Sequence, residues 1–416
     1  MNKIAIIGGG ISGLSTAHFL KDRFDVKVFE KEDKPGGLIK CRWVNGSLFH
    51  TCGGHVFNSK RNDVLEWFWT NFNREKEFSL AERNSTIYMN ETTQIPYPIE
   101  NYIYRLDKNL QYKIIDSLLD IARNGIGDPK NFEEFLKGRF GDTLYEIYFK
   151  PYNEKIWNKE LNQVPLSWLE GKLPMPTIPD IIYNNINHVR EKQFVHSSFW
   201  YEKSNGSQYI ADKLSEGLNI QYNKHIRRIE YKDGMWYIEN ENFDKVIFCG
   251  NLKELPFIID GISIQDYAME IGKLGYHGTT SVFCEIDKNP YSWIYLPNNE
   301  YKSHRIICTG NFVQANNGNS IPQDKITATI EFTGEIDKND ILHNLGKIPF
   351  RPKYIDYQYN KYTYPIQDDN TRSMIKHLKA YLASFNLHFT GRFADWEYYN
   401  MDVAIGAAMD LCKTIK

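Results

Sequence analysis

The first residues whose types and spacing suit chemistry are three glycines near the start of the chain. Gly8, Gly10 and Gly13 fit the pattern G-x-G-x-x-G. In this pattern the first glycine permits a tight turn, the second lets the backbone approach a pyrophosphate, and the third allows a helix to pack closely on a strand. Glu30 ends the next apolar segment, where its carboxylate can accept hydrogen bonds from a ribose. The pattern predicts a dinucleotide site and does not by itself separate NAD from FAD.

Two further segments favour FAD. Gly36 and Gly37 follow the acidic residue, as a second glycine pair does in FAD-linked oxidases, although a plain turn has the same composition. Near the C-terminus, Gly391-Arg392-Phe393 precedes a helix start at residues 401–408 that is rich in small residues. Small residues would let a helix N-terminus approach a flat ring such as an isoalloxazine. Simple helix packing would explain this second segment equally well.

These residues need particular elements to position them. Residues 3–7 and 26–29 read as buried strands on either side of a helix, the βαβ start of a Rossmann-type unit. Residues 206–250 return to α/β character, and a strand at 388–390 precedes the last helix. Residues 275–365 alternate apolar and polar side chains, as in an antiparallel sheet. Between them, residues 105–195 read as helical.

The helical part carries one apolar stripe, and a proline-rich stretch at 173–179 interrupts it. We read the stripe as core packing; it comprises Leu110, Ile114, Ile115, Leu118, Leu119, Ile121, Phe132, Phe135, Leu136 and Phe140.

We therefore predict an α/β fold. It combines a Rossmann-type FAD-binding domain built from discontinuous segments with an inserted helical domain and a mostly antiparallel β-sheet domain that holds the substrate. The predicted segments are 1–80, 200–265 and 383–416 for the FAD-binding domain, 81–100 and 266–382 for the sheet domain, and 101–199 for the helical domain, with a mobile flap near 168–179.

Composition narrows the classes of partner. The 416 residues carry a formal net charge of −2, so no overall field favours nucleic acid or anionic lipid. A phosphorylated substrate must then be met by a few local Arg or Lys side chains. No stretch of about 18 apolar residues occurs, so no membrane span is expected. Six scattered cysteines, without a CxxC pair or a metal-ligand spacing, predict a reducing, cytoplasmic location and no metal site.

With these residues in hand, the chain resembles the UDP-galactopyranose mutases, within the wider group of FAD-linked amine oxidases and protoporphyrinogen oxidases. The resemblance runs nearly end to end, and some pieces favour the eukaryotic type of mutase. The segments that carry it are Gly53-Gly54-His55-Val56, 151–157, 168–173, Trp293-Ile294-Tyr295, Arg305, Tyr364-Pro365 and 391–398.

The resemblance implies a flavin enzyme without net redox change. Reduced FAD would attack the anomeric carbon of the sugar through N5, and the resulting adduct would open and close again through a different hydroxyl. The nucleoside diphosphate would then recapture the sugar as a furanose, for surface glycan synthesis. NAD(P)H is a candidate reductant that would share the substrate cleft, and a homo-oligomer is an open option.

The resemblance also implies roles for individual residues. His55 would lie near flavin N5, Arg392 would face the flavin's electron-rich edge, and Arg305 would clamp the diphosphate. The expected catalytic residues are His55, Arg305, Tyr364, Arg392 and Tyr398. The expected cofactor contacts are Gly8, Gly10, Ser12, Gly13, Glu30, Lys31, Gly37, Leu38, His55, Ile226, Arg392, Met401 and Asp402. The expected substrate contacts are Tyr97, Glu100, Asn153, Trp157, Lys172, Trp293, Tyr295, Arg305, Tyr364 and Tyr398.

Two departures from the family pattern leave the substrate open. Lys172 stands where the eukaryotic-type flap has an arginine, so the charge is kept but the bidentate fork is lost. Glu100 stands where a glutamine that reads uracil is expected, and a carboxylate cannot donate as an amide does. The nucleotide or the sugar could therefore differ from UDP-galactose.

Two other functions share the FAD motifs. The alternative is an FAD-dependent oxidoreductase of the amine oxidase or protoporphyrinogen oxidase type, which needs an apolar or aromatic pocket in place of an Arg and Tyr cluster. A flavin-bearing scaffold or electron-transfer partner is the third hypothesis.

Overall fold

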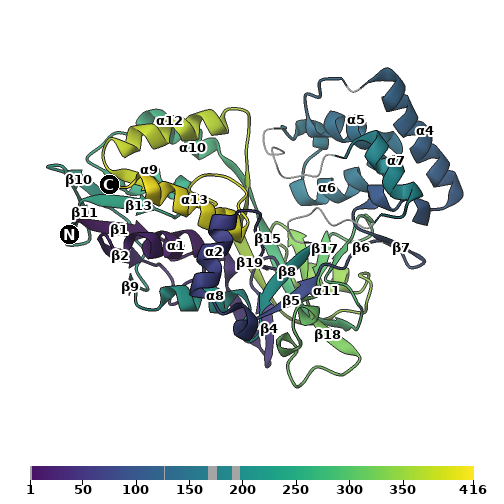
Figure 1. Cartoon of the computed structure of the whole chain (residues 1–416), viewed down its shortest axis with the longest axis horizontal. Helices are drawn as coiled ribbons and strands as arrows, with labels where there is room; N and C mark the ends of the chain where they lie inside the picture. Colours follow the sequence, from purple (N-terminus) through teal and green to yellow (C-terminus); the bar gives the residue numbers. More distant parts are fainter. Residues whose placement is uncertain (1, 126, 167–175, 190–196) are drawn as a thin grey trace.

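A computed structural model describes residues 2–125, 127–166, 176–189 and 197–416 of the chain, and three sheets carry its architecture (Figure 1). The five-stranded sheet is parallel throughout. Its strands are, in spatial order, β20 (Leu387–Phe389), β13 (Lys245–Phe248), β1 (Lys3–Ile7), β2 (Asp25–Phe29) and β9 (Asn219–Gln221). Segments far apart in the sequence thus form one Rossmann-type sheet, which confirms the predicted fold class; the exact domain boundaries stay a proposal.

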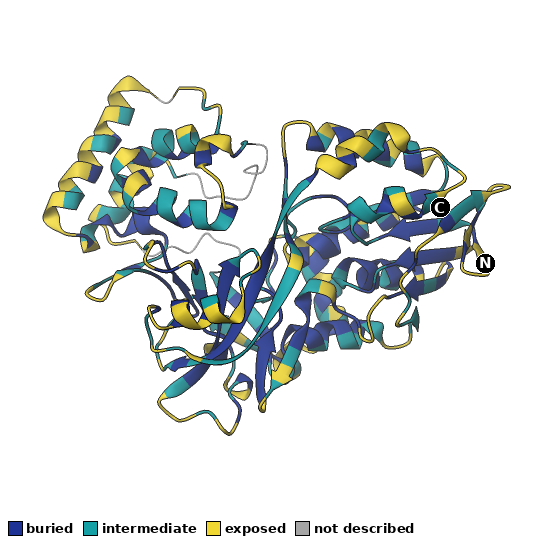
Figure 2. Cartoon of the chain, turned by 180° about the vertical axis from the view of Figure 1, so that it is seen from behind, coloured by how far each residue is buried: buried dark blue, intermediate teal, exposed yellow. Residues whose placement is uncertain are grey.

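Strand β1 is buried on both faces because helices cover the parallel sheet on both sides. Ile4 and Ile6 pack with α1 (Ile11–Leu20) and α13 (Met401–Thr414). Ala5 and Ile7 belong to a second apolar cluster with α12 (Thr371–Ala383). The alternation follows from the two-residue period of a strand. Figure 2 shows the resulting dark-blue layer of buried residues between exposed helix faces.

Smaller elements complete this part of the molecule. A four-stranded sheet packs its Trp236 and Phe243 side chains into the α12 cluster. The strands are β12 (Glu241–Phe243), β11 (Met235–Ile238), β10 (Ile229–Lys232) and β14 (Ile259–Asp260); the nearby helices are α2 (Asn62–Asn71), α3 (Arg74–Glu77), α8 (Ser207–Ser215), α9 (Leu255–Ile258) and α10 (Gln265–Lys273).

The seven-stranded sheet is antiparallel except where β6 pairs with β16, as expected for a mostly antiparallel sheet. Its strands are, in spatial order, β19 (Lys353–Ile366), β15 (Gly275–Asp287), β18 (Lys325–Thr333), β17 (Arg305–Ile307), β16 (Trp293–Tyr295), β6 (Ser85–Asn90) and β7 (Thr93–Pro96). Helix α11 (Lys338–Leu345) packs beside it. Two further sheets have two strands each: β3 (Cys41–Val44) pairs with β4 (Ser47–His50), and β5 (Phe78–Glu82) pairs with β8 (Ser198–Glu202).

The predicted helical segment forms a separate layer above the β6–β7 end of the large sheet (Figure 1). Its helices are α4 (Lys108–Asn124), α5 (Phe132–Leu144), a π-helical turn at Tyr145–Phe149, α6 (Lys150–Trp157) and α7 (Ile178–Ile186). The side chains of Asp107, Asn131 and Thr177 accept hydrogen bonds at the first turns of α4, α5 and α7. Lys155 of α6 joins this layer to the sheet, because its ammonium donates to the carbonyl oxygens of Leu296, at 2.8 Å, and of Asn298.

The structure corrects several local predictions. Ile114 and Leu118 are buried, but Ile115 and Leu119 are 46% and 37% exposed, so the apolar stripe of α4 is narrower than predicted. Helix α7 begins at Ile178, inside the predicted proline break, because proline is compatible with a first helical turn. Helix α2 and the β5–β8 ladder were not predicted.

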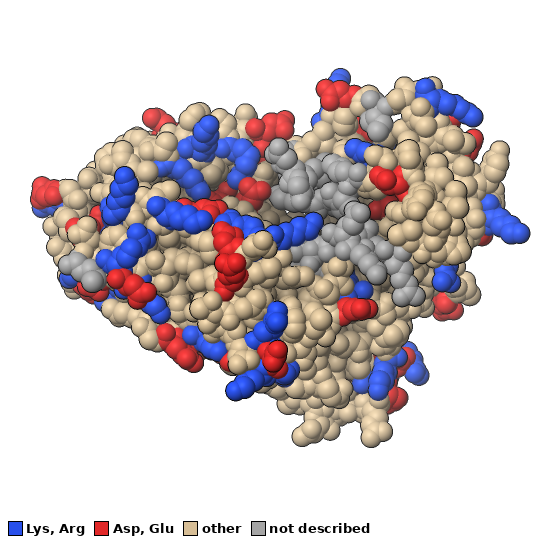
Figure 3. All heavy atoms as spheres, in the orientation of Figure 1, with Lys and Arg blue, Asp and Glu red and all other residues tan. Residues whose placement is uncertain are grey.

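The surface is mixed in charge. Figure 3 shows basic and acidic side chains interspersed over the face displayed, in keeping with the small net charge. No helix in the described part of the chain combines the length and apolar composition that a membrane crossing needs.

Candidate functional site

The glycine-rich turn presents bare backbone at the carboxyl end of β1. Helix α1 starts directly after Gly10, which offers no side-chain cap, so the first N–H groups of the helix face outward. A Cβ atom on Gly10 would meet only the Cα of Gly37, 3.9 Å away. A Cβ atom on Gly13, by contrast, would lie 1.9 Å from the carbonyl oxygen of Gly8. The turn therefore leaves room for a phosphate and requires the third glycine for packing, as predicted.

Glu30 lies where the pattern predicts it, with 6% of its surface exposed. One carboxylate oxygen accepts a hydrogen bond from the Gly9 N–H at 2.6 Å, and the other accepts from the Glu32 N–H at 2.9 Å. Each carboxylate oxygen can accept more than one hydrogen bond. A buried, backbone-held carboxylate beside the glycine-rich turn fits a ribose hydroxyl pair.

The Gly53–His55 loop, defined as residues 53–55, is held through its backbone. The Gly53 N–H donates to Oε1 of Glu331 at 2.8 Å, and the His55 N–H donates to Nδ1 of His50 at 3.4 Å. Burial, and then the Arg392 charge, lower the pKa of His55 to about 4, so its ring is neutral near pH 7. Its Nε2 atom is buried and has no hydrogen-bond partner among the described residues. This atom is therefore free to meet a ligand.

His50 holds the Gly53–His55 loop through its hydrogen bond with the His55 N–H. It is fully buried, and burial lowers its pKa to about 3. Because Nδ1 of the neutral ring accepts from His55, the ring proton is assigned to Nε2, which lies 2.8 Å from the Tyr201 hydroxyl. The tyrosine hydroxyl also accepts a hydrogen bond from Asn316 at 3.1 Å. The loop thus rests on a buried network of neutral polar groups.

A cluster of charged side chains lies in front of the loop. Arg305 and Glu331 are directly opposite each other on β17 and β18. Nε of Arg305 donates to Oε2 of Glu331, and its Nη2 donates to the Tyr364 hydroxyl at 3.0 Å. Burial opposes ionisation of Glu331, but Arg305 and then His304 outweigh it and hold the pKa of the carboxyl well below its usual range. The fully buried carboxylate is therefore charged.

Arg392 extends the cluster toward the glycine-rich turn. Its guanidinium carbon lies 4.1 Å from the ring centroid of Tyr398 and 5.2 Å from that of Tyr364. The two tyrosine rings are stacked, with centroids 5.3 Å apart. Nε of Arg392 is buried without a hydrogen-bond partner among the described residues. The neighbouring Gly391 approaches the Ser12 side chain, so this segment reaches the start of α1.

Below, "the Arg305 cluster" denotes Arg305, Glu331, Tyr364, Arg392 and Tyr398. The structure brings its four predicted members together. Glu331 accepts hydrogen bonds from both the Gly53 N–H and Arg305, which places the Gly53–His55 loop beside the cluster. The predicted catalytic residues therefore converge, drawn from strands β17 and β19, the loop after β4 and the loop before α13.

Some of the predicted substrate contacts, among them Tyr97, Glu100 and Asn153, line a cavity with residues of the helical layer. The rings of Tyr97 and Tyr295 are 4.8 Å apart, and Tyr152 packs edge-on to Tyr295 at 5.5 Å. Arg83, which was not predicted, donates to the Tyr295 hydroxyl and lies 5.5 Å from the Tyr97 centroid. A cavity opens beside these rings; it is lined by Tyr97, Glu100, Phe132, Leu136, Phe140, Tyr148, Phe149, Tyr152 and Asn153.

Several residues predicted to contact the cofactor or the substrate pack in apolar clusters or form hydrogen bonds within the protein. Trp293 and Trp157 belong to the large aromatic core, and Ile226 and Met401 are buried in two other apolar clusters. The Asn153 amide donates to the Phe149 carbonyl at 2.7 Å.

The remaining predicted contacts differ in exposure. Burial raises the pKa of Asp402, which hydrogen-bonds Ser59. Lys31 is exposed, whereas the Leu38 backbone hydrogen-bonds the His55 ring. Lys172 lies outside the described residues.

Glu331, His50 and Arg83 were missed by sequence reasoning. A usable indication existed for Glu331, because it is the one acidic residue inside the apolar and threonine-rich strand β18. A charge in such a strand must be paired if it is buried. His50 and Arg83 carry no comparable local pattern.

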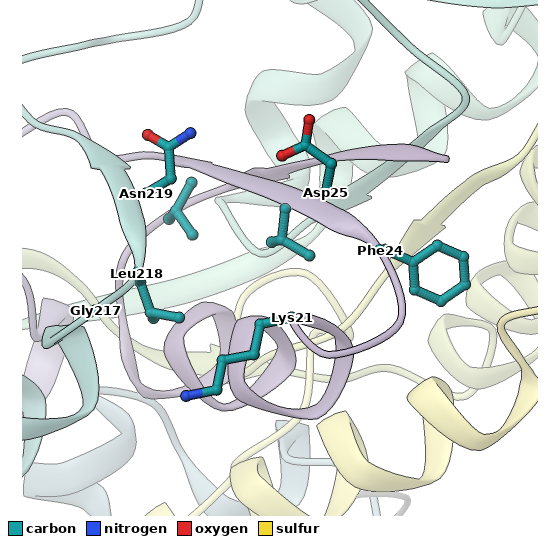
Figure 4. A pocket seen from close by; sticks show the side chains of 8 residues that line it. Lys21, Phe24, Asp25, Gly217, Leu218 and Asn219 are labelled. Atoms are coloured by element: carbon teal, nitrogen blue, oxygen red, sulfur yellow. The ribbon is translucent and has the colours of Figure 1, made fainter. Parts of the chain in front are cut away.

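A second hollow lies away from this site. Figure 4 shows it beside Lys21, Phe24, Asp25 and Asn219, at the amino ends of β2 and β9. Ligands of open parallel sheets bind at the carboxyl ends of the strands, where the glycine-rich turn lies. The geometry therefore favours the turn and the Arg305 cluster over this hollow.

Comparison with known proteins gives matches of two kinds, to a family model and to whole proteins. Residues 6–72 match the family model described as an NAD(P)-binding Rossmann-like domain. The dTDP-fucopyranose mutase of Escherichia coli is 25% identical, over 99% of this chain and 97% of its own length. The UDP-galactopyranose mutase of Mycoplasma genitalium is 23% identical, over 97% of this chain and 92% of its own length. The chain is similar to these mutases over nearly its whole length.

A solved structure of reduced UDP-galactopyranose mutase shares the fold. It superimposes with a TM-score of 0.86 at 20% identity, over 99% of this chain and 93% of that structure. Sequence similarity to mutases over nearly the whole length of the chain indicates an isomerase of the mutase type. The resemblance to the eukaryotic type in particular stays a prediction.

Proposed function

We propose that the chain is an FAD-dependent nucleotide-sugar mutase that interconverts the pyranose and furanose forms of a sugar carried on a nucleoside diphosphate. The observation that carries the proposal is the convergence of Arg305, Arg392, Tyr364 and Tyr398 in front of the Gly53–His55 loop. Two guanidinium groups and two hydroxyls suit a diphosphate, whereas an amine or porphyrinogen oxidase needs a less charged pocket.

The residues present fit FAD. Bare backbone at Gly10 and the N-terminus of α1 would hold the pyrophosphate, and Glu30 would hold the ribose. The unpartnered Nε2 of His55 and Nε of Arg392 are buried polar atoms that a bound ring system would satisfy. Reduced FAD, when bound, supplies the nucleophile for the anomeric carbon.

The chain's own residues would bind and stabilise the departing nucleoside diphosphate. Arg305 donates through Nε to Glu331 and through Nη2 to the Tyr364 hydroxyl, and its remaining N–H groups would bind the phosphates. Burial is the largest cause that raises the pKa of Tyr364 well above the usual range. The Tyr364 hydroxyl therefore stays protonated and can donate a hydrogen bond. Fixed positive charge next to the leaving diphosphate lowers the cost of the charge that develops as the glycosidic bond breaks.

The remaining predicted contacts are assigned on the same basis. Tyr97, Glu100, Asn153, Trp157, Lys172, Trp293 and Tyr295 are proposed to contact the nucleotide, and Ser12, Lys31, Leu38, Ile226, Met401 and Asp402 the cofactor. NAD(P)H is the proposed reductant of the flavin. The proposed location is the cytoplasm, and the proposed biological role is surface glycan synthesis. Because the relatives are named for UDP-galactopyranose and dTDP-fucopyranose, these two sugars are the first substrates to test.

The test is isomerisation by reduced protein. Purified protein is reduced anaerobically and incubated with UDP-galactopyranose, dTDP-fucopyranose and a wider set of UDP-, dTDP- and GDP-pyranoses, and the products are identified by NMR. A furanose formed only by the reduced protein is expected, with oxidised protein as the control. No furanose from any donor, together with flavin bleaching by amines or porphyrinogens, would replace the proposal with an oxidase.

A further inference from the structure

The carboxylate of Glu331 joins two parts of the site that come from distant segments. Oε1 accepts from the backbone N–H of Gly53, at 2.8 Å, and Oε2 accepts from Nε of Arg305. The residue is fully buried, and Nε2 of His304 lies 3.6 Å from Oε2. One rigid group therefore holds both the phosphate-binding arginine and the Gly53–His55 loop.

The two bonds use different oxygens of the same carboxylate, so neither end can shift without moving the other. Charge-assisted hydrogen bonds are shorter and stronger than neutral ones, and burial strengthens them further. A diphosphate arriving at Arg305 brings negative charge that competes with Glu331 for the guanidinium. The change at Oε2 would be passed to Oε1 and so to the Gly53 N–H.

We infer that Glu331 is a positioning residue that couples nucleoside diphosphate binding at Arg305 to the conformation of the Gly53–His55 loop beside the cofactor. The coupling rests on the proposed function, which places the diphosphate at Arg305. Because coupling between two sites is reciprocal, the state of the loop also sets the affinity for the nucleoside diphosphate.

The experiment measures the loop directly in the flavin-loaded protein. Hydrogen exchange of a peptide covering residues 51–57 is followed with and without saturating UDP, and UDP affinity is measured by calorimetry. Wild type, Glu331→Gln and Glu202→Gln are compared. Glu202 is a matched control, because it is 3% exposed and its carboxylate holds a turn through the N–H groups of Ser204 and Asn205, at 2.9 and 2.6 Å.

In wild type, UDP is expected to change the exchange rate of the loop by about tenfold, within the usual range of coupling between sites. Glu331→Gln is expected to show no change in loop exchange at saturating UDP, because the charged carboxylate that joins Arg305 to the Gly53 N–H is lost. Glu202→Gln should keep both wild-type behaviours. A UDP-dependent change that persists in Glu331→Gln would overturn the coupling.

Two outcomes separate the coupling from the proposed function. If the wild type binds none of UDP, dTDP and GDP, the proposed function fails and the coupling fails with it. If it binds one of them without any change in loop exchange, the coupling alone is wrong. Should Glu331→Gln fail to fold, Arg305→Lys keeps the carboxylate but removes the Nε–H donor. Loss of the loop response at saturating ligand is then expected, and its retention would overturn the inference.

Discussion

At the glycine-rich turn the groups that face a ligand are backbone N–H groups of one continuous segment, whereas the Arg305 cluster takes its side chains from three strands and a loop. The turn excludes side-chain volume, as the 1.9 Å distance from a Cβ on Gly13 to the Gly8 oxygen shows. The cluster depends on charge and orientation, with Arg305 fixed by Glu331 and Tyr364. The two regions should therefore fail under different substitutions, one under added atoms and the other under altered donors.

The largest effect is expected for Gly13→Ala. The added methyl group collides with backbone, so α1 must move away from β1 and the phosphate site is lost. Flavin content per protein, read from visible absorbance, should fall by more than about tenfold, and the melting temperature should fall with it. The control is Gly272→Ala, because a Cβ there meets nothing within 4 Å. Wild-type flavin content in Gly13→Ala would contradict the prediction.

The second effect belongs to the cluster. Arg305→Lys keeps the charge but loses the guanidinium fork and its fixed Nε contact with Glu331. Affinity for UDP or dTDP should fall by about tenfold to a hundredfold, from the loss of charge-assisted hydrogen bonds, while flavin content stays at the wild-type level. Arg351→Lys is the control, since Arg351 pairs with Asp287 on the surface and is 81% exposed. Equal affinity in both variants would remove Arg305 from the diphosphate site.

A smaller effect is expected for Tyr398→Phe. The ring would keep its stacking on Tyr364 and its contact with Arg392, and only the hydroxyl would be lost. The rate of isomerisation should fall about threefold to tenfold, as for loss of one hydrogen bond. Tyr237→Phe, at an exposed position, should leave the rate unchanged. An unchanged rate in Tyr398→Phe would show that only the ring of Tyr398 matters.

The smallest effect is a loss of stability in mild acid. The folded pKa values of His50 and His55, about 3 and about 4, lie below the ordinary value of 6.5, so the unfolded chain binds more protons between those values. The free energy of unfolding should therefore decrease as the pH falls from 6.5 to 4. Glu331 adds a further loss as the pH falls below the ordinary carboxyl pKa of 4.5, because the unfolded carboxyl then binds a proton that the folded carboxylate does not.

Urea unfolding at pH 7, 5.5 and 4.5 measures this slope. His50→Gln should make the dependence of the free energy of unfolding on pH less steep, by the contribution of one histidine. A free energy of unfolding that is constant from pH 7 to 4.5 would mean that the two rings are not held neutral by burial.

The turn was predictable because each of its requirements is local. Strand, glycines, helix and acid follow one another within thirty residues, and the structure places Gly10, Gly13 and Glu30 as the pattern requires. Arg305, Tyr364, Arg392 and Tyr398 could be singled out through the family resemblance. Their partner Glu331 could not, because it becomes a neighbour of Gly53 only when β18 is placed beside the loop after β4.

Helix exposure was also beyond local reasoning. Ile115 and Leu119 share the spacing of Ile114 and Leu118, but only the arrangement of α4 and α5 decides which of them is covered. Similarly, β5 and β8 pair across more than a hundred residues, and neither has a hairpin turn to mark it. Periodicity identifies the element in such cases, and tertiary packing decides its neighbours.

The strand order of the parallel sheet has a consequence for how the protein reaches its fold. Strand β1 lies between β2, which follows it closely, and β13, which begins only at Lys245, and β20 at Leu387–Phe389 completes that edge of the sheet. During synthesis, the first βαβ unit must wait with apolar faces uncovered until nearly the whole chain has emerged. Such long-range pairing slows folding and exposes surfaces that aggregate. The yield of folded protein should therefore depend strongly on temperature and on chaperone supply during expression.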